Sequence, residues 1–349
     1  MQFESWAVLT EKEKEERASI DPAGLCDFGI SVLDHALKRI IPNDLILIGA
    51  DSGAGKSSIA IQIGAHNALK GKKVALFFLE GGQNEAIRRV KWKAICEEYY
   101  GNPQDFRVNM DYNNWIINSP EMARLKPIEE IAEKRLNDMF GENFFLYNIT
   151  PDFSGNQRVG YDKIYEGLCD FFDGAEFGKI KFGLDLLIID HLHYFDLEDG
   201  TRSTEAEKIT KAMYRCKEIS DLYKIPTVLI SHLRKKVKDR GLPTQYDFHG
   251  SSSIPKISTN AIVICPAYDL QDNANRIYPT FFRFVKSRRG LKDNYAALVD
   301  YDLNQHKYAD EYKIYPVRSD NSVPADELPG HKYPKWARKK ADTVKDWYG

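Results

Sequence analysis

The sequence predicts an α/β fold: a mostly parallel central sheet flanked by helices, with antiparallel strands at its edge. Three observations support this prediction. Short apolar runs are separated by helical patterns, a glycine-rich turn joins the first run to a helix, and after Asn260 the runs follow one another through turn-rich links. Strands that alternate with helices form right-handed crossovers and a parallel sheet. Closely spaced strands pair antiparallel.

Eight segments show the strand pattern, a short run rich in apolar and β-branched residues. Several are continuously apolar, which is typical of strands buried on both faces in a parallel sheet. The expected parallel strands are Asp44–Ala50, Lys73–Glu80, Asn143–Ile149, Leu184–Asp190 and Thr227–Leu233. The expected antiparallel strands are Ala261–Pro266, Thr280–Ser287 and Asn294–Asp300.

Two helices are predicted between these strands. The first covers about Lys56–Lys70 and is closed by Gly71. The second, Thr204–Lys224, opens with a capping box that pairs its first residue with Glu207. Its apolar stripe consists of Ile209, Met213, Cys216, Ile219 and Tyr223.

The two ends of the chain are polar. Near the N-terminus, the charged segment Thr10–Arg17 has a capping box at Thr10 and Glu13, which predicts a solvated surface helix. The tail Val317–Gly349 contains several prolines followed by the basic-aromatic stretch KYPKWARKK, and we expect it to be loosely ordered.

The composition limits the classes of partner. With 49 Lys and Arg against 51 Asp and Glu in 349 residues, the net charge of −2 gives no global attraction to nucleic acid, so such binding requires local patches. No stretch is apolar enough to span a membrane, and the N-terminus lacks the features of a signal peptide. The five cysteines lie far apart and form no CxxC pair. We therefore expect reduced thiols in a cytoplasmic protein of a bacterium or a virus-infected host cell.

The stretch ADSGAGKSS, Ala50–Ser58, predicts a phosphate-binding loop. It matches G-x-x-x-x-G-K-[ST] except at its first position, where an alanine only has to end a strand. In this motif Lys56 reaches the terminal phosphates of ATP and the Ser57 hydroxyl binds Mg²⁺. The residues expected to contact the nucleotide are Ser52, Gly53, Ala54, Gly55, Lys56, Ser57 and Ser58. The alternative, an ordinary glycine-rich turn, does not require Lys and Ser in this register.

Two carboxylates follow apolar strands. Asp190 ends the run LLIID, and buried strands rarely end in a carboxylate unless it is paired or binds a metal, so it is the second expected Mg²⁺ position. Its neighbour is His191, so the residue that activates water must come from elsewhere. Glu80 ends the second strand and is the candidate catalytic base. A helix cap at Asp190 and a solvent-facing Glu80 are the simpler alternatives.

Three cationic or titratable groups follow later strands. His232 could hydrogen-bond the γ-phosphate and report its loss, although a single histidine is more often structural. Lys286 and Arg288 end a late strand and could neutralise charge developing at the phosphate. Alternatively, they could protect a strand edge from aggregation. We expect this late strand to lie away from the phosphate loop of its own subunit.

A run of basic residues follows His232 and predicts contact with a nucleic-acid backbone. It consists of Arg234, Lys235, Lys236, Lys238 and Arg240, opposed by one acidic residue, Asp239. The alternative is a solvated basic loop.

In this order, the motifs resemble the RecA-like motor domain of ring-shaped replicative helicases. The resemblance covers about Asp27–Asp302 and rests on ADSGAGKSS, FFLE, LLIIDHLH, ISHLRKK, FHGSSSIPKISTNAIVI and FVKSRRG. These segments resemble the DnaB type and, more closely, the phage primase-helicase and mitochondrial helicase branch. The resemblance implies a hexameric ring on single-stranded DNA with ATP between subunits.

The resemblance also implies roles for individual residues. Glu80 matches the catalytic glutamate of the family, and His232 matches its phosphate-sensing histidine. Lys286 and Arg288 match the cations given to the nucleotide of the neighbouring subunit.

The loop that contains Gly250 and Ser251 would line the DNA channel. Departures from the DnaB pattern are histidines at positions 193 and 232, where glutamines are expected. Neither a zinc-binding primase module nor a helical N-terminal domain precedes the motor, so we expect no priming activity. A primase, a polymerase or a loader would be protein partners. The expected segments are a subunit-docking linker at 1–26, the motor at 27–302 and a partly flexible C-terminal extension at 303–349.

Two other functions remain open at this point. A RecA-like recombination ATPase would coat DNA as a filament without moving along it, and a regulatory ATPase of the circadian-clock type would need no DNA. The basic run after His232 favours a DNA-binding function over the regulatory one.

Overall fold

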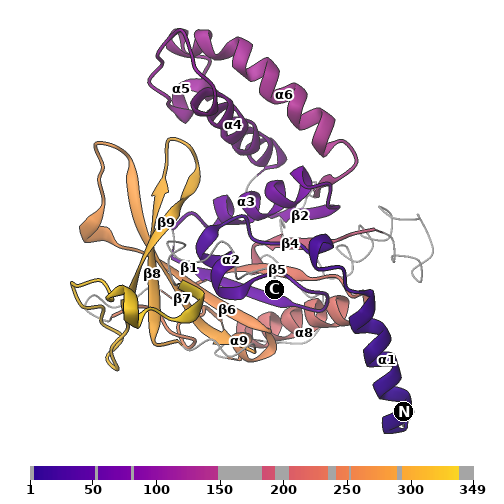
Figure 1. Cartoon of the computed structure of the whole chain (residues 1–349). Helices are drawn as coiled ribbons and strands as arrows, with labels where there is room; N and C mark the ends of the chain where they lie inside the picture. The colour runs from indigo at the N-terminus through magenta and orange to yellow at the C-terminus, as the bar shows by residue number, and fades with distance from the viewer. Residues whose placement is uncertain are drawn as a thin grey trace.

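The computed structural model describes residues 4–51, 54–79, 82–147, 183–192, 204–234, 241–250, 253–288 and 293–337. Within these residues, nine strands form one sheet in the order β3-β2-β4-β5-β1-β6-β7-β8-β9 (Figure 1). The strands are β1 (Leu45–Ala50), β2 (Val74–Phe78), β3 (Phe144–Tyr147), β4 (Leu186–Asp190), β5 (Thr227–His232), β6 (Asn260–Pro266), β7 (Ile277–Ser287), β8 (Tyr295–Asp302) and β9 (Lys307–Pro316). The predicted α/β class, with a mostly parallel sheet and antiparallel strands at its edge, is confirmed.

Helices cover both faces of the sheet. They are α1 (Trp6–Ser19), α2 (Ser31–Leu37), α3 (Lys56–Leu69), α4 (Gln83–Gly101), α5 (Tyr112–Ile116), α6 (Lys126–Phe140), α8 (Glu205–Tyr223) and α9 (Ile254–Ile257). Short 3-10 turns lie at Pro22–Gly24, Pro120–Leu125, Tyr268–Leu270, Gly330–Lys332 and Lys335–Ala337. None of the helices in the described ranges is long and apolar enough to cross a membrane.

The central strand β1 divides the core. Its residues Ile46 and Ile48 pack in one apolar cluster with α3, and Leu45 and Leu47 pack in a second cluster with α8. This alternation explains the unbroken apolar run, because both faces of the strand are covered. The predicted capping box at the start of α8 is present, and four of its five stripe residues are buried.

The sequence interpretation was wrong at two strands. β6 was expected among the antiparallel strands, but it pairs parallel with β1, with Asn260 opposite Ile46. β9 was not predicted, because it is an edge strand on which Asp310 and Glu311 are exposed and few side chains point into the core. The sheet therefore continues past Asp302, where the motor segment was expected to end.

Part of the C-terminal tail packs on the sheet, contrary to expectation. Tyr333 and Ala337 are buried, and the Trp336 ring meets Phe284 edge-on with centroids 5.4 Å apart. The backbone N–H of Leu328 donates to the carbonyl of Ile314 on β9. Residues 338–349 lie outside the described residues.

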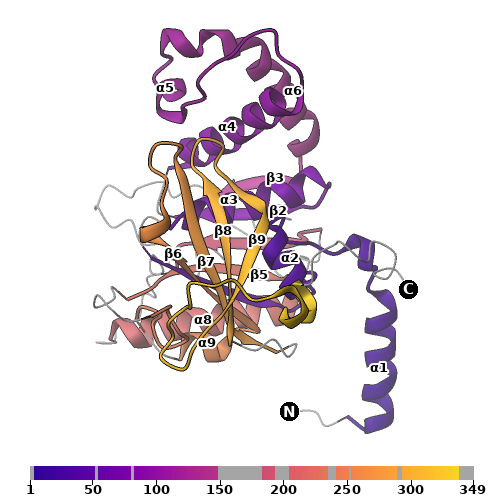
Figure 2. The same cartoon turned by 60° about the vertical axis from the view of Figure 1, so that its left-hand side comes forward.

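Helices α4, α5 and α6 form a helical lobe, residues 83–140, between β2 and β3 in the chain. The lobe lies outside α3, at the top of the molecule in Figures 1 and 2. It also contacts the β-hairpins: Trp92 Nε1 donates to the Asn304 carbonyl (2.6 Å), and Arg276 forms an ion pair with Asp111 (2.7 Å). The lobe was not anticipated from the sequence.

Helix α1 projects away from the sheet and has no buried residue (Figure 2). It begins earlier than expected: Ser5 is the N-cap, and its Oγ accepts from the Val8 N–H. The capping box predicted at Thr10 is wrong, since Thr10 lies inside the helix and its hydroxyl donates to the Trp6 carbonyl.

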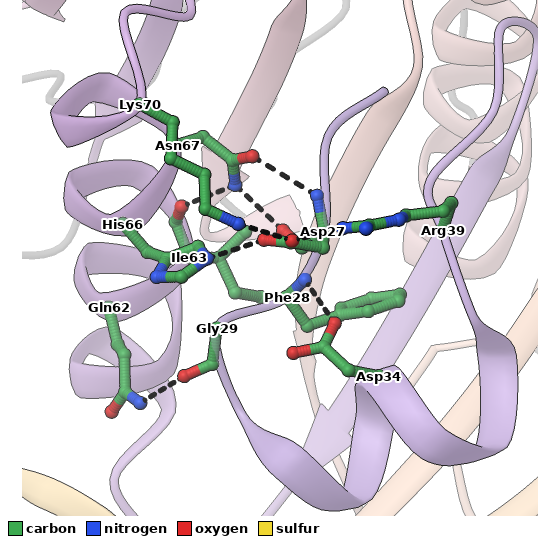
Figure 3. Close-up of polar contacts among 10 residues, drawn as sticks. All are labelled: Asp27, Phe28, Gly29, Asp34, Arg39, Gln62, Ile63, His66, Asn67 and Lys70. Atoms are coloured by element: carbon green, nitrogen blue, oxygen red, sulfur yellow. Dashed lines mark hydrogen bonds and ion pairs between the residues drawn. The ribbon is translucent and has the colours of Figure 1, made fainter. Parts of the chain in front are cut away.

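A buried carboxylate fixes the segment after α1 to helix α3 (Figure 3). Asp27 is 5% exposed and binds Arg39 together with two side chains of α3, His66 (2.5 Å) and Lys70 (2.5 Å). The Asn67 side chain also hydrogen-bonds the backbone N–H and carbonyl of Asp27. The segment before α2 is thus held against the helix that starts at the phosphate loop.

Asp27→Asn should destabilise the protein by about 2 kcal/mol at pH 7. Burial alone would raise the pKa of Asp27, but hydrogen bonds from His66 and Lys70 outweigh it and lower the pKa to about 2. Because the folded pKa is depressed, this stabilisation is present above the unfolded value near 4 and is lost as the pH falls towards 2. Urea unfolding at pH 7 and pH 3 measures the difference.

A suitable control is Asp221→Asn, which removes an exposed ion pair with Lys217 and should change stability little. Equal stability of Asp27→Asn and the wild type at pH 7 would contradict the role of Asp27.

Candidate nucleotide-binding site

The predicted phosphate loop lies at the carboxyl end of the central strand, between Ala50 of β1 and Lys56 of α3. Gly55 has φ of 77° and precedes α3 without a side-chain cap, a left-handed conformation that glycine adopts at little cost. The first turn of a helix directs free N–H groups at an anion, so α3 offers a phosphate site at this position. Ser52 and Gly53 lie outside the described residues.

Lys56 and His232 meet at this end of the sheet. The parallel pairing of β1 with β5 places His232 opposite Ala50. The Nζ of Lys56, which is 7% exposed, lies 2.5 Å from His232 Nδ1. Burial, followed by the charges of Lys56 and His249, lowers the pKa of His232 to about 4. The imidazole is therefore neutral at pH 7, and its Nδ1 can accept a hydrogen bond from the ammonium group.

Asp190 ends β4 and is fully buried, with Phe78 of β2 on one side and Ile230 of β5 on the other. His191 follows it and is also buried, and its ring centroid lies 4.0 Å from that of His232. A carboxylate at this strand end and the half-buried Ser57 of α3 are both oxygen ligands of the kind Mg²⁺ prefers. The donor set therefore fits a Mg²⁺–nucleotide complex. The candidate base Glu80 lies outside the described residues.

Three side chains that the sequence interpretation missed contact the loop and the first turn of α3. Tyr308 OH donates to the Ala54 carbonyl (3.2 Å), and Tyr301 OH donates to Ser58 Oγ (2.9 Å). Arg89 of the helical lobe also donates to Ser58 Oγ (3.2 Å). These residues come from β9, β8 and α4, so no local motif could have indicated them.

Lys286 and Arg288 do not reach the phosphate loop of their own chain. β7 runs antiparallel to β6, which places Ser287 opposite Asn260, and Asn260 lies opposite Ile46 at the start of β1. The loop begins four residues further on, about 13 Å along the strand, and two strands away. These cations therefore lie towards the opposite end of the sheet.

The two cations have different surroundings. Lys286 Nζ donates to the carbonyls of Pro255 (2.7 Å), Lys256 (2.6 Å) and Ser258 (2.6 Å), at the end of α9. Burial, together with the charge of Arg288, lowers the pKa of Lys286 to about 8. Arg288 is exposed. Of the two, Arg288 is the side chain presented to the surface.

The predicted DNA-binding segments are partly described. Arg234 is exposed, and its N–H donates to the Asp247 carbonyl (2.7 Å), while the N–H of His249 donates to the His232 carbonyl (3.0 Å). Gly250 has φ of 86°, and a Cβ on it would lie 2.3 Å from Ile209 of α8. Lys235, Lys236, Lys238, Arg240 and Ser251 lie outside the described residues.

Solved structures with this fold include replicative helicases. One helicase ATPase domain superposes with a TM-score of 0.66 at 15% identity, over 86% of this chain and 96% of that one. A DnaB-like replicative helicase, solved in a study of its interactions with primase, gives 0.64 at 14% identity, over 88% of this chain and 67% of that one. The fold is that of a DnaB-type helicase ATPase domain. The predicted RecA-like fold is thereby confirmed.

Sequence comparison points to the same DnaB type, although no family model matches the chain. The replicative DNA helicase DnaC of Bacillus subtilis (strain 168) is 23% identical over 232 residues, and DnaB of Buchnera aphidicola subsp. Baizongia pistaciae (strain Bp) is 24% identical over 230. Each alignment covers 65% of this chain, and the chain spans 44% and 43% of the two relatives. The resemblance to DnaB-type helicases is confirmed, and its closer link to the phage and mitochondrial branch stays a prediction.

Proposed function

We propose that the chain is an ATP-dependent DNA translocase and helicase that works as a ring, with six subunits expected, on single-stranded DNA. The observation that carries the proposal is the DnaB-type fold with a phosphate loop at the carboxyl end of its central strand. In this function Lys56 binds the terminal phosphates, Ser57 and Asp190 hold Mg²⁺, and Glu80 activates water. Bound Mg²⁺ would bridge the β- and γ-phosphates and neutralise developing charge.

Hydrolysis at subunit interfaces is supported by the position of Arg288. A phosphoryl-transfer site needs a cation for the charge that develops on the γ-phosphate. Arg288 and Lys286 lie towards the opposite end of the sheet from their own phosphate loop. In a ring, the exposed Arg288 would serve the nucleotide of the neighbouring subunit.

Coupling to DNA is supported by the hydrogen bonds at the end of β5. His232, which contacts Lys56, accepts from the N–H of His249 through its backbone. The next residue, Gly250, starts the loop expected to line the channel, and Arg234 starts the basic run. Loss of the γ-phosphate at His232 would therefore be felt by both DNA-binding segments. Protein partners such as a primase, a polymerase or a loader belong to this proposal.

ATP turnover with and without single-stranded DNA tests the proposal. A motor on DNA should hydrolyse ATP faster when the strand is added, and the stimulation should fall steeply with salt because phosphate contacts release counterions. Turnover that ignores DNA would favour the regulatory ATPase. Filaments in place of rings by negative-stain microscopy would favour the recombination ATPase.

His232→Ala should uncouple DNA from hydrolysis, because the same strand end contacts Lys56 and leads into the DNA-binding segments. Basal turnover should survive, and stimulation by single strands should not. His249→Ala is the matched control, since it keeps the backbone N–H that bonds His232 and should keep the stimulation. A normal rise in turnover with DNA in His232→Ala would rule out the sensor role.

A further inference from the structure

One arginine of the helical lobe reaches the phosphate site from within the same chain. Both Nε (3.0 Å) and Nη2 (2.5 Å) of Arg89 donate to one Glu85 oxygen, and Nη1 donates to Ser58 Oγ (3.2 Å). The side chain is 26% exposed, which leaves part of the guanidinium open to a ligand. Glu85 lies one helical turn earlier on α4 and fixes the orientation of the arginine.

Ser58 is surrounded by donors. It is 5% exposed, and its Oγ receives hydrogen bonds from both Arg89 and Tyr301. A hydroxyl oxygen has two lone pairs, so with both engaged its own proton remains to donate to a third group. Arg89 and Ser58 together thus present N–H and O–H donors beside the first turn of α3, which suits a phosphate oxygen.

The order of residues in the first turn identifies which phosphate this is. Lys56 of the motif reaches the β- and γ-phosphates, and the Mg²⁺ that bridges them binds the hydroxyl of Ser57. The next residue, Ser58, lies on the side of the remaining phosphate. We propose that Arg89 binds the α-phosphate of the nucleotide in its own subunit. This inference rests on the proposed nucleotide-binding function, and it assigns a ligand contact to the helical lobe.

Arg89→Ala should weaken the binding of ATP and of ADP by the same factor, about 10–100-fold, because both carry the α-phosphate. Competition against a fluorescent ATP analogue measures both dissociation constants. Arg88→Ala is the matched control: loss of this exposed neighbouring arginine should leave both constants unchanged. Arg89→Gln, which keeps much of the side-chain length, serves the same purpose if the alanine variant does not fold. Wild-type affinity for both nucleotides in the folded variant would overturn the proposal.

A sulfur-substituted nucleotide separates direct contact from a structural brace between α4 and α3. Separated diastereomers of ATPαS replace one or the other non-bridging α-oxygen with sulfur. Direct contact predicts that one diastereomer binds the wild type more weakly than ATP, and that this loss shrinks or disappears in Arg89→Ala. Equal losses in wild type and variant, or no loss with either diastereomer, would overturn the contact.

The controls distinguish this inference from the function on which it rests. A wild-type chain that binds no ATP would remove the proposed function and the inference together. Binding that is lost in Lys56→Ala but unchanged in Arg89→Ala would remove the inference alone.

Discussion

Lys56→Ala is expected to abolish ATP hydrolysis, a loss of about 10²–10³-fold or more, and to weaken nucleotide binding sharply. The Lys56 ammonium group lies next to His232 at the start of α3, where it is positioned to neutralise the terminal phosphates. Helix α3 is held mainly by apolar packing and by Asn67, so the variant should stay folded.

Steady-state ATPase assays and nucleotide titrations measure these effects, and circular dichroism checks the fold. Lys211→Ala, which removes an exposed lysine of α8, should behave like the wild type. Wild-type turnover in Lys56→Ala would refute the phosphate-loop assignment and with it the proposed ATPase.

Arg288→Ala should lower ATP turnover by about 10³–10⁵-fold, the range of an arginine finger. The loss should be repairable by a second copy, since this side chain lies far from its own phosphate loop. Arg288→Ala subunits and Lys56→Ala subunits should each be inactive alone. Mixed rings contain interfaces with an intact loop on one side and an intact arginine on the other, so mixing should restore part of the ATPase.

Two comparisons complete this experiment. A chain that carries both substitutions should stay inactive, because none of its interfaces has an intact loop or an intact arginine. Arg318→Ala, at another exposed arginine, should keep full turnover. Full activity of Arg288→Ala at concentrations where the protein is monomeric would show that the arginine does not act between subunits.

The strands that carry the site could be predicted because their physical signal is local. Central strands such as β1 and β4 are covered on both faces, so every residue is apolar until the strand end, where Ala50 leads into the loop and Asp190 appears. β9 gave no such signal, since at the sheet edge it needs few inward side chains. The helical lobe was missed because α4 and α6 are largely polar and are joined by ion pairs such as Lys91–Glu133.

The site itself could be predicted only where residues are neighbours in the chain. Gly55 and Lys56 belong to one motif, but Arg89, Tyr301 and Tyr308 reach the loop through folding of distant segments. The sequence also could not indicate that Lys286 would bind the carbonyls at the end of α9. Such contacts depend on strand register and on which ends of the sheet the strands share.

The central claim, that the chain is a DNA motor driven by ATP, is tested most directly by strand separation on a forked duplex. The account predicts that the wild type displaces one strand when ATP and Mg²⁺ are present. It predicts no displacement by Lys56→Ala, or by the wild type with a non-hydrolysable ATP analogue. A wild-type protein that hydrolyses ATP at full rate, binds the fork and never separates the strands would contradict the helicase assignment.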